Sequence, residues 1–219
     1  MTKVIARVFL SIFLLLSSML AVADPFSLDD IFAAITNGET AAIEQFLNRG
    51  MDPNIQHPDG NTALIMASRE GRTEIVKTLL DHGAKVYVRN RQDETAVMLA
   101  AYEGHNAIVD LLVAWGAELG GNRRGWTPLA YAAYAGRCET VARLLTGYGV
   151  EPDARINNGM TALMLAAKEG HVPCVESLLS AGADPNLKAG PGRTAVRLAR
   201  NAGHTDIVDM LKEAGAKDR

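Results

Sequence analysis

The chain has 219 residues, a formal net charge of −3 at pH 7, and 5% aromatic residues. This mildly acidic balance argues against a general affinity for nucleic acid or for an anionic membrane surface. With two cysteines, the chain has no dense disulfide framework, and its length is sufficient for a hydrophobic core.

The first 23 residues differ in composition from the rest of the chain. Basic residues come first, then an apolar run, then small residues: Lys3 and Arg7, Val8 to Leu16, and Ala21-Val22-Ala23. This order predicts a secretory signal peptide cleaved after Ala23. An uncleaved anchor is the alternative, but the apolar stretch is shorter than the ~20 residues that cross a bilayer as a helix. We therefore expect a periplasmic or secreted protein whose mature domain is 24–219, without membrane insertion after cleavage.

Glycines recur through the remaining chain with a period close to 33 residues. One set breaks a pair of short helices and the other ends the pair: Gly38, Gly71, Gly104, Gly136, Gly170 and Gly203, then Gly50, Gly83, Gly116, Gly149, Gly182 and Gly215. In the clearest copy, the pattern predicts helices over Ala162 to Lys168 and Val172 to Ser180. Apolar residues on one side of such a pair need neighbouring copies to cover them, so the period predicts a stacked repeat protein.

The repeats resemble those of the ankyrin family. The matching openings and breaks are Thr62-Ala-Leu-Ile, Thr95-Ala-Val-Met, Thr127-Pro-Leu-Ala, Thr161-Ala-Leu-Met, Thr194-Ala-Val-Arg, Gly104-His105, Gly170-His171 and Gly203-His204. The resemblance implies an all-α ankyrin-repeat solenoid of six helix-turn-helix repeats with short β-turn fingers. The expected repeats are 27–57, 58–90, 91–122, 123–155, 156–188 and 189–219.

The chain departs from the family pattern in several places. The family's opening His is replaced in every copy, by Ile65, Met98, Ala130, Met164 and Arg197. In the first repeat, Asp29 is expected to cap the helix that contains Ile31 to Ile35. The finger between Gly116 and Thr127 is one residue shorter than the others and rich in glycine. This shortening fits either neutral loop drift or a finger reshaped for a partner.

Cys138 and Cys174 occupy different positions in adjacent repeats. A disulfide needs Cα atoms less than ~7 Å apart, whereas adjacent helices pack at ~10 Å. We therefore expect two buried thiols and a fold that does not depend on a bridge.

One row of side chains is predicted to face the concave groove. These residues stand two positions before each breaking glycine, where repeats three and four both carry tyrosine. With the neighbouring finger, the predicted partner-binding residues are Arg69, Tyr102, Arg123, Arg124, Trp126, Tyr134 and Lys168. Tyrosine and arginine are frequent in binding hot spots, which favours this assignment. Tyr131 and Trp115 are instead expected to pack between repeats.

The candidate catalytic residues in the sequence already have structural roles in the repeats, so they do not form a recognisable catalytic site. We also expect no cofactor or metal. The prediction is a non-enzymatic, monomeric module that binds another protein and not nucleic acid. Resemblance to exported bacterial ankyrin proteins implies two roles. One is an immunity or inhibitor protein that neutralises a toxic effector. The other is a helper of an envelope enzyme, as in catalase-linked protection from oxidative stress. An enzyme is the third alternative.

Overall fold

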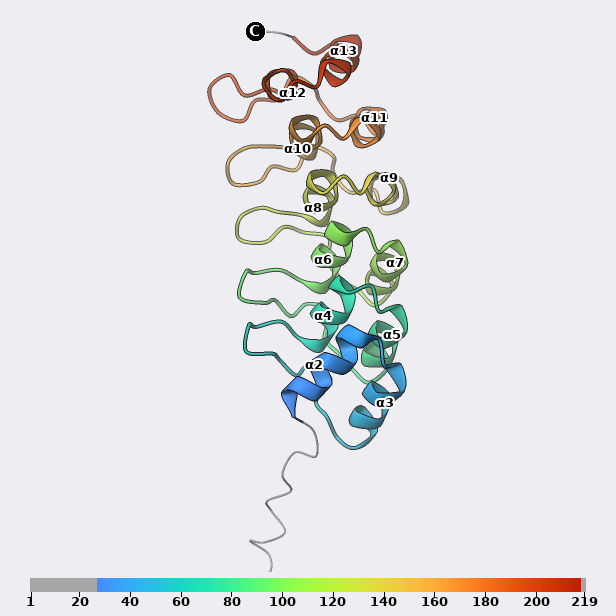
Figure 1. The fold of residues 1–219 in the computed structure, drawn as a ribbon. Coiled ribbons are helices and arrows are strands. Elements are labelled where there is room, and N and C mark those ends of the chain that lie inside the picture. The colour runs from blue at the N-terminus through green and yellow to red at the C-terminus, as the bar shows by residue number, and fades with distance from the viewer. Residues whose placement is uncertain (1–26, 218–219) are drawn as a thin grey trace, which may run out of the picture.

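The computed structural model describes residues 27–217, so the predicted signal peptide lies outside the described residues. Twelve helices follow one another here: α2 (Leu28–Asn37), α3 (Thr40–Asn48), α4 (Ala63–Arg69), α5 (Thr73–Asp81), α6 (Ala96–Glu103), α7 (Asn106–Ala114), α8 (Pro128–Tyr134), α9 (Cys138–Gly147), α10 (Ala162–Glu169), α11 (Val172–Ser180), α12 (Ala195–Ala202) and α13 (Thr205–Glu213). They form six antiparallel pairs stacked in one column (Figure 1). The all-α ankyrin solenoid predicted from the sequence is confirmed.

The even-numbered helices form an inner row and the odd-numbered helices an outer row, while the connecting fingers project from the inner row on one side (Figure 1). Each finger closes as a hairpin turn. In the first finger, for example, the His57 N–H donates to the Asn61 carbonyl at 2.8 Å. Within residues 27–217, no helix combines the length and the apolar character needed to span a membrane.

Threonine and glycine set the ends of the inner helices. The Thr62 hydroxyl accepts a hydrogen bond from the Ile65 N–H at 3.1 Å, so it satisfies a free donor in the first turn of α4. Thr127, Thr161 and Thr194 cap α8, α10 and α12 in the same way. Each breaking glycine has a positive φ, from 69° at Gly136 to 86° at Gly170, which ends the helix in the left-handed region.

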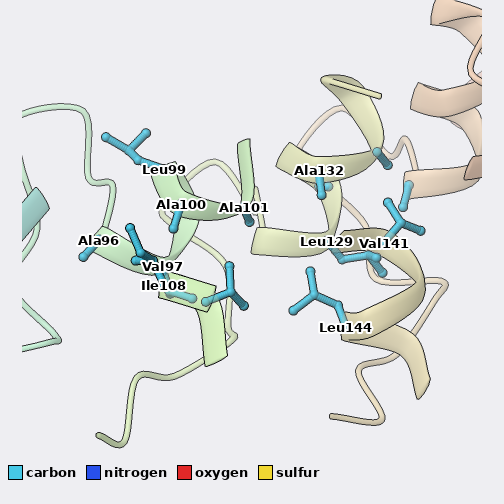
Figure 2. Packing of buried hydrophobic residues seen from close by; sticks show 14 of the residues in the cluster. Ala96, Val97, Leu99, Ala100, Ala101, Ile108, Leu129, Ala132, Val141 and Leu144 are labelled. Atoms are coloured by element: carbon cyan, nitrogen blue, oxygen red, sulfur yellow. The ribbon is translucent and has the colours of Figure 1, made fainter. Parts of the chain in front are cut away.

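Small residues let the inner helices pack closely. Ala100 and Ala101 of α6 and Ala132 of α8 are fully buried, and Leu129 and Leu144 fill the space beside them (Figure 2). Alanine brings neighbouring backbones together while the larger aliphatic side chains occupy the gap to the outer row. The core is therefore continuous along the stack, as a repeat protein requires.

From Gly71 onward, the residue that follows each breaking glycine binds back onto the preceding repeat. The His171 imidazole donates from Nε2 to the Tyr134 carbonyl at 3.1 Å, and its ring covers Gly136. The equivalent bonds run from Arg72 to Thr36, from His105 to Arg69, from Arg137 to Tyr102 and from His204 to Lys168. We call this series the backward ladder. It explains why this position holds either histidine or arginine, since both are donors with a planar group that packs over glycine.

The expectation of two free thiols is wrong. Cys138 and Cys174 form a disulfide, and their Cα atoms are 4.6 Å apart. The distance between two helix axes exceeds the distance between the Cα atoms of residues that face each other. A Cα atom lies ~2.3 Å from its helix axis, so facing residues on helices 8–10 Å apart approach to about 5 Å. Both cysteines lie in the first turn of neighbouring outer helices, α9 and α11.

Two smaller expectations also fail. The first helix begins two residues earlier than a cap at Asp29 predicts, because Ser27 is the N-cap and forms a capping box with Asp30. Trp115 does not pack between repeats, since it ends α7 and 46% of its surface is exposed.

Candidate protein-binding groove

The predicted row of groove residues lies at the end of successive inner helices. Arg69 ends α4, Tyr102 lies one residue before the end of α6, and Tyr134 ends α8. Lys168 takes the same place in α10. Because the backward ladder binds the carbonyl of each of these residues, their backbones are fixed relative to the next repeat.

Four aromatic side chains meet between repeats three and four. The ring centroids of Trp126 and Tyr134 are 5.6 Å apart at 88°, and those of Trp126 and Tyr131 are 5.1 Å apart. Tyr102 contacts Tyr131 edge to face at 6.1 Å. We call Tyr102, Trp126, Tyr131 and Tyr134 the aromatic cluster. It concentrates large, rigid contact area in a chain with few aromatic residues.

Tyr131 connects the aromatic cluster to the finger of repeat three. Its hydroxyl donates to Glu94 Oε1 at 2.8 Å, while the other oxygen of Glu94 accepts from the Asn90 amide at 2.9 Å. Burial and then the Glu94 hydrogen bond raise the pKa of Tyr131 above its ordinary value of 10.0. The phenol is therefore protonated at neutral pH and fixed as a donor, which corrects the expectation that it only pads the space between repeats.

Buried asparagines shape the two fingers beside the aromatic cluster. The Asn90 side-chain oxygen accepts from the backbone N–H groups of Gln92 and Glu94, at 3.0 and 2.9 Å. Asn122 does the same for Arg124 and Trp126 in the next finger. Sequence reasoning missed these residues, although both stand five positions before the opening threonine of their repeat, a recurrence that could have found them.

A polar pocket of about 340 Å³ lies beside Tyr102, between the fingers and the inner helices of repeats two and three. Three carboxylates, Asp59, Glu94 and Glu103, line it together with Arg69. The Arg69 guanidinium pairs with Glu70 at 3.1 Å and contacts the Met66 sulfur, so a neighbouring carboxylate already offsets part of its charge. This end of the groove is consequently acidic.

The remaining predicted residues lie outside the aromatic cluster. Arg123 and Arg124 form the exposed tip of the third finger, where the Arg123 N–H donates to Asp93 Oδ2 at 2.6 Å. Lys168 pairs with Glu169 at 2.6 Å, and this hydrogen bond raises the pKa of Lys168. Of the seven predicted residues, the structure thus brings Tyr102, Trp126 and Tyr134 into one contact surface, with Arg69 beside it and the other three at its margin.

The described residues contain no group of three or more His, Cys, Asp and Glu side chains arranged to hold a metal ion. Cys174, which the sequence places near His171, is joined to Cys138. The polar groups of the groove are paired with one another in a network of tyrosine, asparagine and carboxylate groups. This arrangement holds a surface in a fixed shape, as a docking site needs.

Comparison with known proteins agrees with this architecture. The family model for ankyrin repeats (3 copies) matches residues 31–122, 88–156, 116–189 and 141–218. The chain therefore belongs to the ankyrin-repeat family. It is 42% identical over 60 residues to the ankyrin repeat and SOCS box protein 2 of Bos taurus, a match that covers 27% of this chain and 10% of that protein. Since so little of that relative is covered, the likeness concerns the repeats.

Proposed function

We propose that the chain is an exported, non-enzymatic module that binds another protein through its concave groove and fingers. Ankyrin repeats generally mediate binding to other proteins, which supports the interaction role at the level of the family. The single observation that carries the choice of surface is the aromatic cluster, in which Trp126 contacts Tyr134 and Tyr131, and Tyr131 contacts Tyr102. Tyrosine and tryptophan contribute most to binding when they form such a rigid surface.

Two features support export to an oxidising compartment, the periplasm in a bacterium. The first 23 residues have the order of a signal peptide. The Cys138–Cys174 disulfide suits a compartment where disulfides persist. The proposal leaves two roles for the bound partner, a toxic effector that is inhibited or an envelope enzyme that is assisted, and the identity of the captured protein separates them.

One experiment tests both parts. The protein is tagged at its C-terminus, recovered from fractionated cells of its own host, and sequenced from its N-terminus, where we expect Asp24 first. Partner affinity is then measured for the wild type and for the Tyr102→Ala/Tyr134→Ala variant. We expect the variant to bind more weakly by roughly 2 kcal/mol, about thirtyfold, because it loses two hot-spot side chains.

The matched control is Lys77→Ala, on the outer helix α5, which should leave affinity unchanged. Circular dichroism establishes that each variant is folded. A folded double-tyrosine variant that binds its partner at full strength would remove the groove from the interface. A full-length protein retained in the cytosol would overturn export.

A further inference from the structure

The tips of the last three fingers carry positive charge and no carboxylate. Five cations lie on them, and all five are exposed: Arg123, Arg124, Arg155, Lys188 and Arg193. The tip segments 120–126, 155–160 and 187–194 contain neither Asp nor Glu, although the chain as a whole is acidic. We call these five residues the basic row.

Two of the five cations of the basic row, Arg155 and Arg193, are held in place without being neutralised. Arg155 donates from Nη1 to the carbonyls of Gly159 and Lys188, at 3.0 and 2.9 Å, and Arg193 donates from Nε to the Ala189 carbonyl at 2.7 Å. A carbonyl satisfies the donor but removes no charge. These guanidinium groups are therefore fixed for contact with an anion before it arrives.

Little acidic compensation comes from elsewhere in the chain. Within residues 27–217, the carboxylate that lies within 4.0 Å of the basic row is Asp93, 3.6 Å from Arg123 Nε, and that arginine side chain is 89% exposed. Asp153 also interacts electrostatically with Arg155, but its oxygens accept the Asp184 N–H at 3.2 Å. Ion pairs this exposed are weak, so most of the positive charge stays available.

The three fingers also form one rigid strip. The Asn157 backbone and side chain donate to the Arg124 and Arg123 carbonyls at 2.8 and 2.9 Å, and Arg155 continues the contact to the last finger, at the Lys188 carbonyl. A Cβ atom on Gly125 would lie 2.9 Å from the Arg155 carbonyl oxygen, so glycine allows the two fingers to approach. Glycine in this finger thus allows close contact between the fingers of adjacent repeats.

From this we infer that the partner presents an acidic protein segment to the basic row, with an apolar or aromatic side chain placed on the aromatic cluster. The inference rests on the proposed protein-binding function and specifies the chemistry of the partner. The acidic end of the groove favours a peptide segment over a long polyanion. A continuous nucleic acid strand or an anionic membrane extending past Tyr102 would meet Asp59, Glu94 and Glu103.

The test uses a fluorescent peptide of alternating Glu and Ser that ends in Tyr, titrated into the mature protein. The informative variant is Arg124→Glu/Lys188→Glu, since within residues 27–217 these two side chains form no hydrogen bond or ion pair that their loss would break. The control, Lys77→Glu/Lys212→Glu, makes the same change of charge on the outer helices α5 and α13. Oligothymidylate of equal length and vesicles containing phosphatidylglycerol serve as competing anions.

We expect the acidic peptide to bind the wild type and the control equally, to bind the Arg124/Lys188 variant at least about tenfold more weakly, and to dissociate as salt is added. Equal affinity for both variants, absence of binding, or tighter binding of the oligonucleotide or the vesicles would overturn the inference. The proposed function is tested separately. Suppose that the native partner still binds the Arg124/Lys188 variant but not the Tyr102/Tyr134 variant. The groove is then the binding surface, and the inference of an acidic partner segment is wrong.

Discussion

At the scale of single residues, the breaking glycines satisfy two requirements at once. Gly136 has a φ of 69°, and a Cβ atom there would lie 2.7 Å from the His171 ring. That ring cannot simply move away, because its Nε2 donates to the Tyr134 carbonyl. Gly203 has a similar φ of 86° but has nothing within 4 Å of its missing Cβ. Both glycines have the left-handed backbone conformation, but only Gly136 is packed against a ring. Comparing substitutions at the two positions therefore separates the cost of the backbone conformation from the cost of the ring contact.

We expect Gly136→Ala to lower the free energy of unfolding by more than Gly203→Ala. The left-handed conformation alone costs an alanine about 1–2 kcal/mol, and at Gly136 the displaced imidazole also loses its hydrogen bond. Urea denaturation measures both variants. In a His171→Ala background, where no ring blocks the Cβ atom, the additional cost of Gly136→Ala should fall to that of Gly203→Ala. An unchanged cost there would show that the ring contact contributes nothing.

At the scale of the elements, one inner helix lacks the side-chain cap that the other five have. The Thr95 hydroxyl at the start of α6 makes no capping hydrogen bond, and it is buried without a partner within residues 27–217. Thr62 occupies the equivalent place in α4 and caps it. Both threonines are followed in the sequence by alanine and two larger apolar residues, a shared pattern that predicts a cap for each.

Replacing each threonine with valine should therefore have opposite outcomes. Thr62→Val removes the cap and should cost about 1 kcal/mol of stability. Thr95→Val keeps the shape of the side chain and removes a buried hydroxyl that has no partner, so it should be neutral or stabilising. Thermal and urea unfolding of the two variants make the comparison. A large loss at Thr95 would mean that its hydroxyl has a partner, for example an ordered water.

Periodic features could be predicted from the sequence and features of side-chain packing could not. The glycine period predicted the helix pairs because each glycine determines where the backbone turns. It also predicted that Tyr102 and Tyr134 are neighbours, because they hold equivalent positions. Tyr131 was misjudged, although it stands three residues before Tyr134 and so lies on the same face of the helix. The disulfide was missed because the contact of two cysteines depends on where their Cα atoms lie on the facing helices, beyond the distance between helix axes.

At the scale of the whole molecule, the disulfide joins the fourth repeat to the fifth. The two cysteines are 36 residues apart and lie on neighbouring outer helices, so the bridge spans a repeat boundary near the middle of the stack. Stacked repeats are stabilised mainly by their nearest neighbours. A covalent link at one boundary therefore stabilises the repeats on both of its sides against separation there.

Reduction should lower the melting temperature by several degrees. For a loop of this length, the loss of conformational entropy in the unfolded chain corresponds to roughly 3–4 kcal/mol. Scanning calorimetry with and without a reductant measures the effect. The Cys138→Ser/Cys174→Ser variant is the control and should melt like the reduced wild type in either buffer. Coincident transitions for the oxidised and reduced wild type would show that the bridge adds no stability.

The backward ladder also gives the stack a direction. Each repeat receives its closing hydrogen bond from the repeat that follows it, so a chain growing from its N-terminus always ends in a repeat that is not yet secured. Each newly added repeat forms the hydrogen bond that completes the repeat before it. These bonds can therefore form in the order in which the chain is synthesised. Within the described residues this series of closures stops at Gly203, where nothing lies within 4 Å of the position that a Cβ atom would take.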